Sequence, residues 1–570
     1  MATSLSVPSP DASHIACLSG ARLEIRSLAT LDIVRSIAIP NSQDVRNSRL
    51  AWSPLSKASD TADQDESTAW RSNRALVFDD DTTRVYDVRD EKWSAVISNG
   101  SGGMGKNVHV EFGATEDEVV VWSDFAACVK IWCLRTGRAV EIRDPKFPGK
   151  ENRGWAYRPS TRAGHGHGRG QVLALLCRSS GIDLLLLLAA RTYTLLSRVE
   201  LPTADAANLR WSRDGRWLAI WDAASAGYSL HVYTADGHLY RTMAREPCDD
   251  MDAWGIQGLG IKSVEWIPGN EKLAVGGWDR RVRILSTRTF APLVFLDHTP
   301  IIHVPDAPVY TEHMDGQGHG SYMLTPQPAT PPKAVLEKNE SARMKQGISL
   351  IAVNADGTLC ATRDDSTPST VWIWDLARLA PRTILIQYAP IKSLQWHPHH
   401  PSHLLIHTTH DAPLIYLYTA QPLDAPSSPF VQHAPPPTIL ALQTHLPNPA
   451  GPCPPTRWTT SWLATPPNAK PVLTLAHGQG YVVVWPHGKD QRFQRREDEE
   501  EESDDSLYHI LTGRTPVPRQ DDQGEGEGRR ESMGSVSALD DTFGAKRGRG
   551  GASHVPVVVG LSESGVDEIF

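Results

Sequence analysis

A repeated cadence of three strand-like segments is the feature that most restricts how this chain can fold. Residues 262–285 read KSVEWIPGNEKLAVGGWDRRVRIL, and residues 348–374 read ISLIAVNADGTLCATRDDSTPSTVWIW. Each stretch has an apolar segment, a polar turn, a second apolar segment, a turn containing aspartate, and a third segment that ends near a large apolar residue. The same cadence recurs at 108–134 and 209–237. The chain is therefore expected to consist of copies of one structural unit.

The end of the third segment gives a measure of the repeat. We place it at nine positions: Arg26, Tyr86, Trp132, Leu188, Tyr233, Leu285, Trp374, Tyr418 and Trp485. The smallest spacings lie near ~45 residues, which matches the ~40–45-residue period of WD-type propeller blades. These spacings predict an all-β fold, a WD-repeat β-propeller with about seven to nine blade units. One ring and two smaller rings are both compatible with the sequence.

Insertions explain the larger spacings and set the domain map. Residues 10–298 are expected to hold about six blade units, and residues 347–488 about three more. We interpret the Pro/His/Gly-rich stretch 299–346 and the Pro-rich segment 421–456 as flexible insertions. Residues 489–570 contain the run EDEEEESDD and few apolar residues, so we expect a disordered, charged tail with at most a short apolar patch.

Composition and charge exclude several classes of protein. The 18 Trp, 43 Gly and 42 Pro favour short strands and tight turns over a helical bundle. The formal charge of −9 comes from residues 490–570, so the rest of the chain is neutral and direct nucleic-acid binding is not expected. The most apolar stretch, residues 182–190, is far shorter than the ~20 residues of a membrane span, so no membrane partner is expected. Seven scattered cysteines without a CxxC pair favour reduced thiols in the cytosol or nucleus.

No motif in the sequence predicts catalysis or a cofactor. The G-x-x-x-x-G-K match from Gly100 to Lys106 is followed by Asn107 and a strand pattern, whereas a phosphate-binding loop needs Ser or Thr and then a helix. The HPHHP cluster at 397–401 lies where a blade turn is expected and is more typical of a Pro-fixed turn than of a zinc site. We therefore expect a protein without enzymatic activity.

Two short patterns indicate candidate phosphorylation sites. Thr330 begins Thr-Pro-Pro-Lys, which fits the S/T-P-x-K pattern preferred by cyclin-dependent kinases. Ser532 ends Arg-Arg-Glu-Ser, which fits a basophilic kinase. Such short patterns often arise by chance in Pro-rich or charged stretches.

Three stretches resemble a known family. GIKSVEWIPGNEKLAVGGWDRRVRIL (260–285), GISLIAVNADGTLCATRDDSTPSTVWIWDL (347–376) and PIKSLQWHPHHP (390–401) are similar to the centrosomal WD-repeat family known as WD repeat-containing protein eight. The resemblance implies a non-enzymatic scaffold at the microtubule-organising centre, which is the spindle pole body in fungi and the centrosome in animals. It also implies that the scaffold anchors microtubule minus ends and supports spindle organisation. The implied partners are a coiled-coil anchoring protein and a minus-end-directed kinesin.

The most family-specific string, ATRDDSTPSTVWIWD, supplies the candidate interaction residues. Arg363, Asp364 and Asp365 are expected in a turn, where charged side chains remain solvated and available to a partner. Replacing Arg363 and Asp365 with Ala should then weaken recovery of the coiled-coil partner and change stability little. Trp372 and Trp374 lie two apart on one strand, so both should face the same side and be buried.

A second function class stays open at this point. The chain could instead be a WD-repeat adaptor of another complex, either a substrate receptor of a ubiquitin ligase or a component of an RNA particle. The neutral charge of the repeats disfavours an RNA role. The docking motifs of ligase receptors are short and degenerate, so the sequence does not exclude that role.

Overall fold

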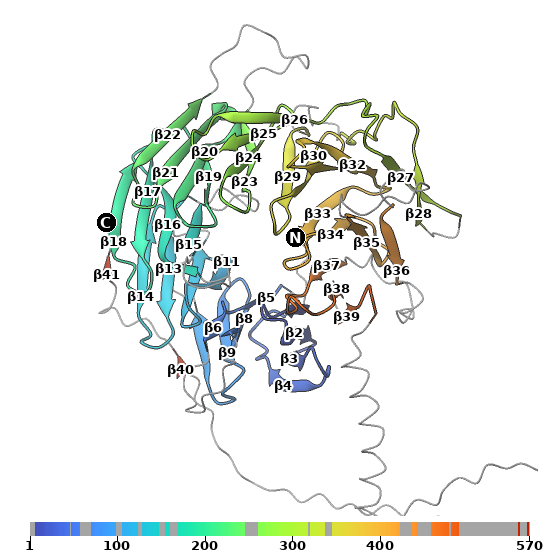
Figure 1. Ribbon diagram of the computed structural model, residues 1–570. Coiled ribbons are helices and arrows are strands. Elements are labelled where there is room, and N and C mark those ends of the chain that lie inside the picture. Colours follow the sequence, from blue (N-terminus) through green and yellow to red (C-terminus); the bar gives the residue numbers. More distant parts are fainter. Residues whose placement is uncertain are drawn as a thin grey trace, which may run out of the picture. The chain divides into compact units, whose positions relative to one another are not determined.

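A computed structural model shows the fold of the chain. The residues that it describes are 6–45, 47–57, 70–98, 105–123, 128–146, 154–159, 169–244, 260–316, 320–336, 345–421, 436–442, 458–477, 480–488, 557–558 and 567–568. Nine antiparallel blades follow one another along the chain and stand around a ring within one compact unit (Figure 1). The predicted all-β propeller is thus confirmed, with nine blades in a single ring.

The strands of each blade are mostly consecutive in the sequence. Blades one to three are β1 (Ser6–Pro8), β2 (His14–Ser19), β3 (Arg22–Ser27) and β4 (Ile33–Ala38); β5 (Arg49–Trp52), β8 (Arg74–Phe78), β9 (Thr82–Asp87) and β10 (Ser94–Ser98); and β11 (Asn107–Phe112), β12 (Glu118–Ser123), β13 (Cys128–Cys133) and β14 (Ala139–Arg143). Blades four to six are β15 (Trp155–Pro159), β16 (Arg169–Ser179), β17 (Ile182–Ala189) and β18 (Leu195–Glu200); β19 (Ala206–Trp211), β20 (Trp217–Asp222), β21 (Ser229–Thr234) and β22 (Leu239–Ala244); and β23 (Ile261–Trp266), β24 (Lys272–Gly277), β25 (Arg281–Ser286) and β26 (Pro292–Asp297).

The last three blades are less regular. They are β29 (Ile348–Val353), β30 (Leu359–Asp364), β31 (Thr370–Asp375) and β32 (Ala380–Ile386); β33 (Ile391–Trp396), β34 (His403–Thr408), β35 (Leu414–Thr419) and β36 (Thr438–Ala441); and β37 (Thr459–Trp462), β38 (Leu473–His477) and β39 (Gly480–Val484). Outside this pattern lie β6 (Ser56–Lys57), β7 (Trp70–Arg71), β27 (Val309–Met314), β28 (Gly320–Leu324), β40 (Val557–Val558), β41 (Asp567–Glu568) and the 3-10 turn η1 (Ala224–Ala226). No helix among the described residues is long and apolar enough to cross a membrane.

The core lies between neighbouring blades. Alternate residues of a strand point to opposite faces of its sheet, and in a propeller each face packs on the next blade. The largest cluster joins Val282 and Ile284 of β25 to Trp372 and Trp374 of β31. The two tryptophan rings are stacked with centroids 5.3 Å apart, and both are buried, as predicted from their spacing.

The nine predicted third-strand ends match the blades. Eight of these residues lie in the third strand of successive blades, and Trp485 directly follows β39. The match arises because a blade is a local unit whose third strand packs between neighbouring blades, so a large apolar residue recurs near the end of that strand.

The interpretation of 299–346 as a flexible insertion is wrong for its central part. Strands β27 and β28 form an antiparallel pair, and β27 joins β32 in parallel to extend blade seven to six strands. Glu312 of β27 is buried and accepts hydrogen bonds from the Tyr388 amide (2.8 Å) and the Tyr416 hydroxyl (2.9 Å). The extension is therefore bonded to both blade seven and blade eight.

The structure describes only part of the predicted insertion 421–456 and of the predicted tail 489–570. Within 421–456, residues 438–441 form β36, the outer strand of blade eight, so this segment contains part of a blade. Residues 422–435 and 443–457 lie outside the described part of the chain. The predicted disordered tail, 489–570, also lies outside it, except for β40 and β41, which pair in parallel with β10 and β14.

Candidate functional site

Asp364, one of the three predicted interaction residues, is a fully buried carboxylate. Asp364 ends strand β30 and is not in a turn, which corrects the expectation from sequence. Its Oδ1 accepts hydrogen bonds from the amides of Gly347 (2.9 Å) and Ser366 (3.0 Å). Its Oδ2 pairs with Arg280 of blade six. Burial is the largest single influence and would raise the pKa of Asp364, but the charge of Arg280, the nearby His298 and the hydrogen bonds from Ser366 together outweigh it and lower this pKa.

The two flanking charges connect three blades. Arg363 also lies in β30, and it donates hydrogen bonds to the Ile391 carbonyl of blade eight and to Ser349 Oγ (2.7 Å). Asp365 follows the strand and accepts from Ser349 Oγ (2.6 Å), and it pairs with Lys262 of blade six. The side chains of Arg363 and Asp365 are 15% and 22% exposed. Their contacts indicate a structural role, and a role in partner binding stays a prediction.

A hydrogen-bonded chain beside Asp364 was not found from the sequence. Trp374 Nε1 donates to Thr362 Oγ1 (2.8 Å), and His298 Nε2 lies 2.8 Å from the same hydroxyl oxygen. His298 precedes the added strands, and its ring contacts Trp372 and Trp374 with centroids 5.2 and 5.9 Å away. WD repeats carry a Gly-His … Trp-Asp signature. Here Asp297-His298 and Trp374-Asp375 occupy these places, so the signature itself could have located the chain of bonds.

The candidate phosphorylation sites differ in what the structure describes. Thr330 is exposed between the buried Ala329 and Pro331, so its hydroxyl is accessible to an enzyme. Ser532 lies outside the described residues. Phosphorylation of either residue stays a prediction.

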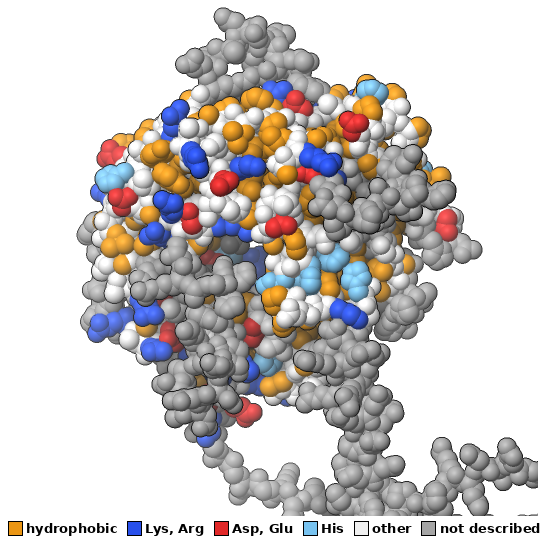
Figure 2. Space-filling view, in the orientation of Figure 1, with side chains coloured by type: hydrophobic (Ala, Val, Ile, Leu, Met, Phe, Trp, Pro, Cys, Tyr) orange, Lys and Arg blue, Asp and Glu red, His pale blue; other side chains and the backbone are white. Residues whose placement is uncertain are grey.

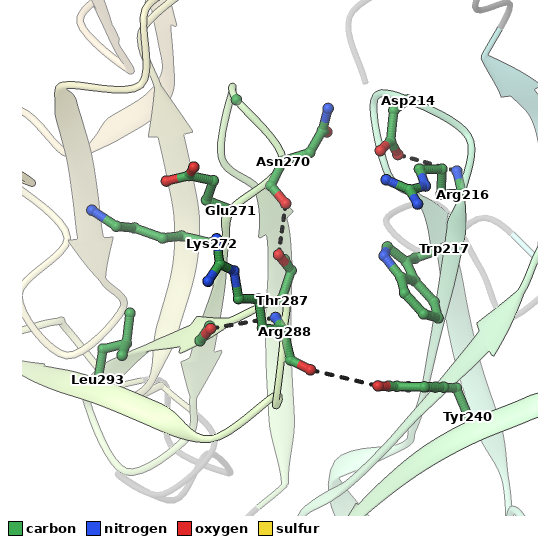
Figure 3. A pocket seen from close by; sticks show the side chains of 12 residues that line it. Asp214, Arg216, Trp217, Tyr240, Asn270, Glu271, Lys272, Thr287, Arg288 and Leu293 are labelled. Atoms are coloured by element: carbon green, nitrogen blue, oxygen red, sulfur yellow. Dashed lines mark hydrogen bonds between the residues drawn. The ribbon is translucent and has the colours of Figure 1, made fainter.

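A cleft between blades five and six is a candidate binding site. It has a volume of about 760 Å³ and is lined by Asp214, Arg216, Trp217, Tyr240, Gly269, Asn270, Glu271, Lys272, Ser286, Thr287, Arg288 and Leu293. Figure 3 shows the side chains of Trp217 and Tyr240 facing the turns of blade six across the cleft. The Trp217 and Tyr240 rings lie 4.6 Å apart. Tyr240 and Leu293 are 50% and 53% exposed.

The side chains that line the cleft are of kinds that commonly bind proteins. Thr287 Oγ1 donates to the Asn270 carbonyl (2.7 Å), and Ser286 Oγ accepts from the Arg288 amide (3.3 Å), so both hydroxyls hold the backbone. The lining residues include no histidine or cysteine that could act as a base or nucleophile. Half-exposed tyrosine, tryptophan and arginine are the residues that dominate binding energy at protein interfaces.

The histidine turn of blade eight does not form a metal site. His397 is fully buried, and its Nδ1 accepts hydrogen bonds from the amides of His399 (3.1 Å) and His400 (2.9 Å). This bonding fixes the turn. Among the described residues, no group of three or more His, Cys, Asp or Glu side chains could hold a metal ion.

On the face of the molecule that Figure 2 shows, basic and acidic side chains are interspersed among hydrophobic ones.

Comparison with known proteins agrees with the blade geometry. No protein-family model matches the chain. WD repeat-containing protein WRAP73 of Mus musculus is 26% identical over 420 residues, which cover 69% of this chain and 80% of that protein. The chain is a nine-bladed β-propeller that is similar in sequence to a WD-repeat protein.

Two further matches are with a fungal protein and a solved structure. An uncharacterized WD repeat-containing protein of Schizosaccharomyces pombe is 25% identical over 304 residues, 51% of this propeller chain and 56% of that relative. The solved structure of the C-terminal WD40 domain of Sif2 is 11% identical, with a TM-score of 0.40, over 72% of this chain and 94% of that domain.

Proposed function

We propose that this WD-repeat propeller is a non-enzymatic scaffold at the microtubule-organising centre, in the cytoplasm and cytoskeleton. Its role there is to anchor microtubule minus ends and to support spindle organisation. Its partners are a coiled-coil anchoring protein and a minus-end-directed kinesin. The location and the partners rest on the resemblance of 260–285, 347–376 and 390–401 to the centrosomal WD-repeat family. The match to a WD-repeat relative over 420 residues supports a shared propeller.

The cleft between blades five and six is the observation that carries the scaffold role. It places an aromatic pair, Trp217 and Tyr240, beside the exposed Leu293, and charged side chains surround them. A central apolar anchor with a polar rim is the arrangement of a protein-binding site. We place the contact with the coiled-coil partner here, because a helix can insert apolar residues into such a cleft.

Fluorescence microscopy of the tagged chain in dividing cells tests the location. Foci at the spindle poles are expected. A diffuse nuclear signal would instead favour a WD-repeat adaptor of another complex, and would refute the proposal.

Matched variants test the cleft. The double variant Tyr240→Ala/Leu293→Asp should abolish the foci at the spindle poles and the co-purification of the coiled-coil partner. Leu196 is 57% exposed on β18, outside the cleft, so Leu196→Ala is the control that should keep both. The changes at Leu196 and Leu293 are at the surface and should alter stability by no more than about 0.5 kcal/mol. Loss of the contact between the Tyr240 and Trp217 rings should cost about 0.5–1.5 kcal/mol. Equal recovery of the partner with both variants would remove the cleft from the interface.

A further inference from the structure

In the described part of the chain, blade nine has one strand fewer than the other blades. In blades one to eight, the third strand pairs with a fourth strand along its outer edge. Blade nine consists of β37, β38 and β39, and among the described residues no strand pairs with the outer edge of β39. The N–H and C=O groups on that edge are left without a ladder, and such edges are templates for another strand.

The burial of β39 indicates a missing cover. All five of its residues, GYVVV, are half-buried, whereas the corresponding strand of blade seven, β31, is buried throughout. Natural edge strands are usually protected by charged residues, proline or bulges. The outer strand of blade four, β18, carries Arg198 and Glu200. β39 has neither a charged residue nor a proline.

The two neighbouring blades give the vacant position two different faces. On the side of blade eight, Leu440 and Leu442 pack with the apolar side chains of blade nine. On the side of blade one, Arg26 pairs with Glu24 at 2.8 Å, and both charges act on the Tyr481 phenol of β39. Tyr481 and Val483 also pack with the apolar Ile15 and Cys17 of blade one. A strand added at this edge would therefore meet apolar side chains on the blade-eight face, and a charged pair beside apolar side chains on the blade-one face.

The segment that comes soonest after β39 is a poor fourth strand. Residues 490–502, DQRFQRREDEEEE, contain one apolar residue in thirteen. The outer strand of blade six, β26, reads PLVFLD. A segment so rich in charge cannot supply the apolar face that Leu440 and Leu442 require.

We propose that the outer edge of β39 is a docking site for an extended segment of a partner protein, which adds the fourth strand of blade nine. The segment alternates apolar residues, facing blade eight, with polar or charged residues, facing blade one. This mode is β-strand addition, in which main-chain hydrogen bonds supply affinity and alternate side chains supply specificity. It deepens the proposed scaffold function by giving it a second contact surface, and it rests on sheet geometry that does not depend on the cellular location.

A synthetic peptide provides the probe. The peptide alternates valine with threonine and glutamate over seven residues, and fluorescence anisotropy with the full-length chain measures its binding. Two matched peptides carry N-methylation at one or the other of two adjacent central residues, which keeps the side chain and removes one N–H; because successive N–H groups point to opposite sides, one of the two peptides loses a ladder N–H. We expect that peptide to bind about tenfold more weakly, because one lost ladder bond and its unpaired acceptor are worth about that factor. Hydrogen exchange of the full-length chain should slow at residues 480–484 when the first peptide is added.

Proline substitutions locate the edge. Successive N–H groups of a strand point to opposite sides, so one of the N–H groups of Val482 and Val483 faces the free edge. Of Val482→Pro and Val483→Pro, the variant that keeps the wild-type melting temperature has lost only the outward N–H. That variant should bind the peptide at least about tenfold more weakly.

Three results would overturn the proposal. One is equal binding of the unmethylated peptide and both methylated peptides. Another is slowed exchange at a different edge, such as β28 or β36, with none at β39. The third is full protection of residues 480–484 before any peptide is added, since the chain itself would then fill the edge. None of these in-vitro outcomes depends on where the protein lies in the cell, so failure here is distinct from failure of the proposed function.

Discussion

His298 should make blade seven sensitive to acid. The ring is fully buried against two tryptophans, and burial lowers the pKa of His298 from its usual 6.5 to about 4, although Asp364 acts to raise it. Nδ1 has no hydrogen-bond partner in the described part of the chain, so a proton on both ring nitrogens would leave an N–H unsatisfied there. The folded state therefore holds His298 neutral at pH 7.

The magnitude follows from proton linkage. The unfolded chain protonates this histidine near pH 6.5, whereas the folded chain resists protonation down to about pH 4. The stability that His298 contributes is thus complete above pH 6.5 and is lost as the pH falls toward 4. At pH 5.0, which is about 1.5 pH units below the usual pKa, the loss is ~2 kcal/mol at 1.36 kcal/mol per unit.

Native-state hydrogen exchange measures this loss where it occurs. The opening free energy of strands β30 and β31 is compared at pH 7.5 and pH 5.0, after correction for the intrinsic exchange rate, in the wild type and in His298→Asn. The variant will be less stable at both values of pH. Its stability should fall by ~2 kcal/mol less than that of the wild type between them. An identical pH dependence in the two proteins would refute the view that the buried imidazole is the proton-sensitive group.

Two further substitutions test the contacts of blade seven. Asp364→Ala leaves Arg280 buried without its carboxylate and should lower the free energy of unfolding by ~3–5 kcal/mol in urea titration, where a loss below ~1 kcal/mol would contradict a structural role. Glu312→Ala removes the acceptor for the Tyr416 hydroxyl and the Tyr388 amide. We expect ~1–3 kcal/mol less stability and faster proteolysis within 309–324, whereas an unchanged cleavage rate would show that β27 is held by its ladder alone.

The blades could be predicted from the sequence because their signals are local. A strand, a turn and the next strand lie within ~45 residues, and the large apolar residue near the end of each third strand fills the space between blades. Trp374 and Tyr418 therefore marked their strands correctly. Strand β27 gave no such signal, because its partner β32 comes some seventy residues later and pairs in parallel. A local pattern carries no information about such a pairing.

Charged residues were harder to interpret for the same reason. Arg363, Asp364 and Asp365 look like a solvated turn in the sequence, but Lys262 and Arg280 reach them from blade six. Which charges are paired across blades depends on contacts between residues far apart in the chain. Contacts between blades thus explain part of the string ATRDDSTPSTVWIWD. The exposed side chains of the cleft, Tyr240 and Leu293, could be found only from coordinates.

Closure of the ring is where the missing strand has its largest effect. Among the described residues, the first and last blades share no strand. They join through side chains, with Ile15, Cys17 and Leu28 of blade one packed against Leu463 and Val472 of blade nine. Tyr481 and Val483 add to this joint but are only half-buried. A fourth strand on β39 would cover them and add apolar burial at the joint that links the two ends of the ring. Any partner that binds this edge in the folded state stabilises the closed ring by mass action, so docking and ring stability are coupled at blade nine.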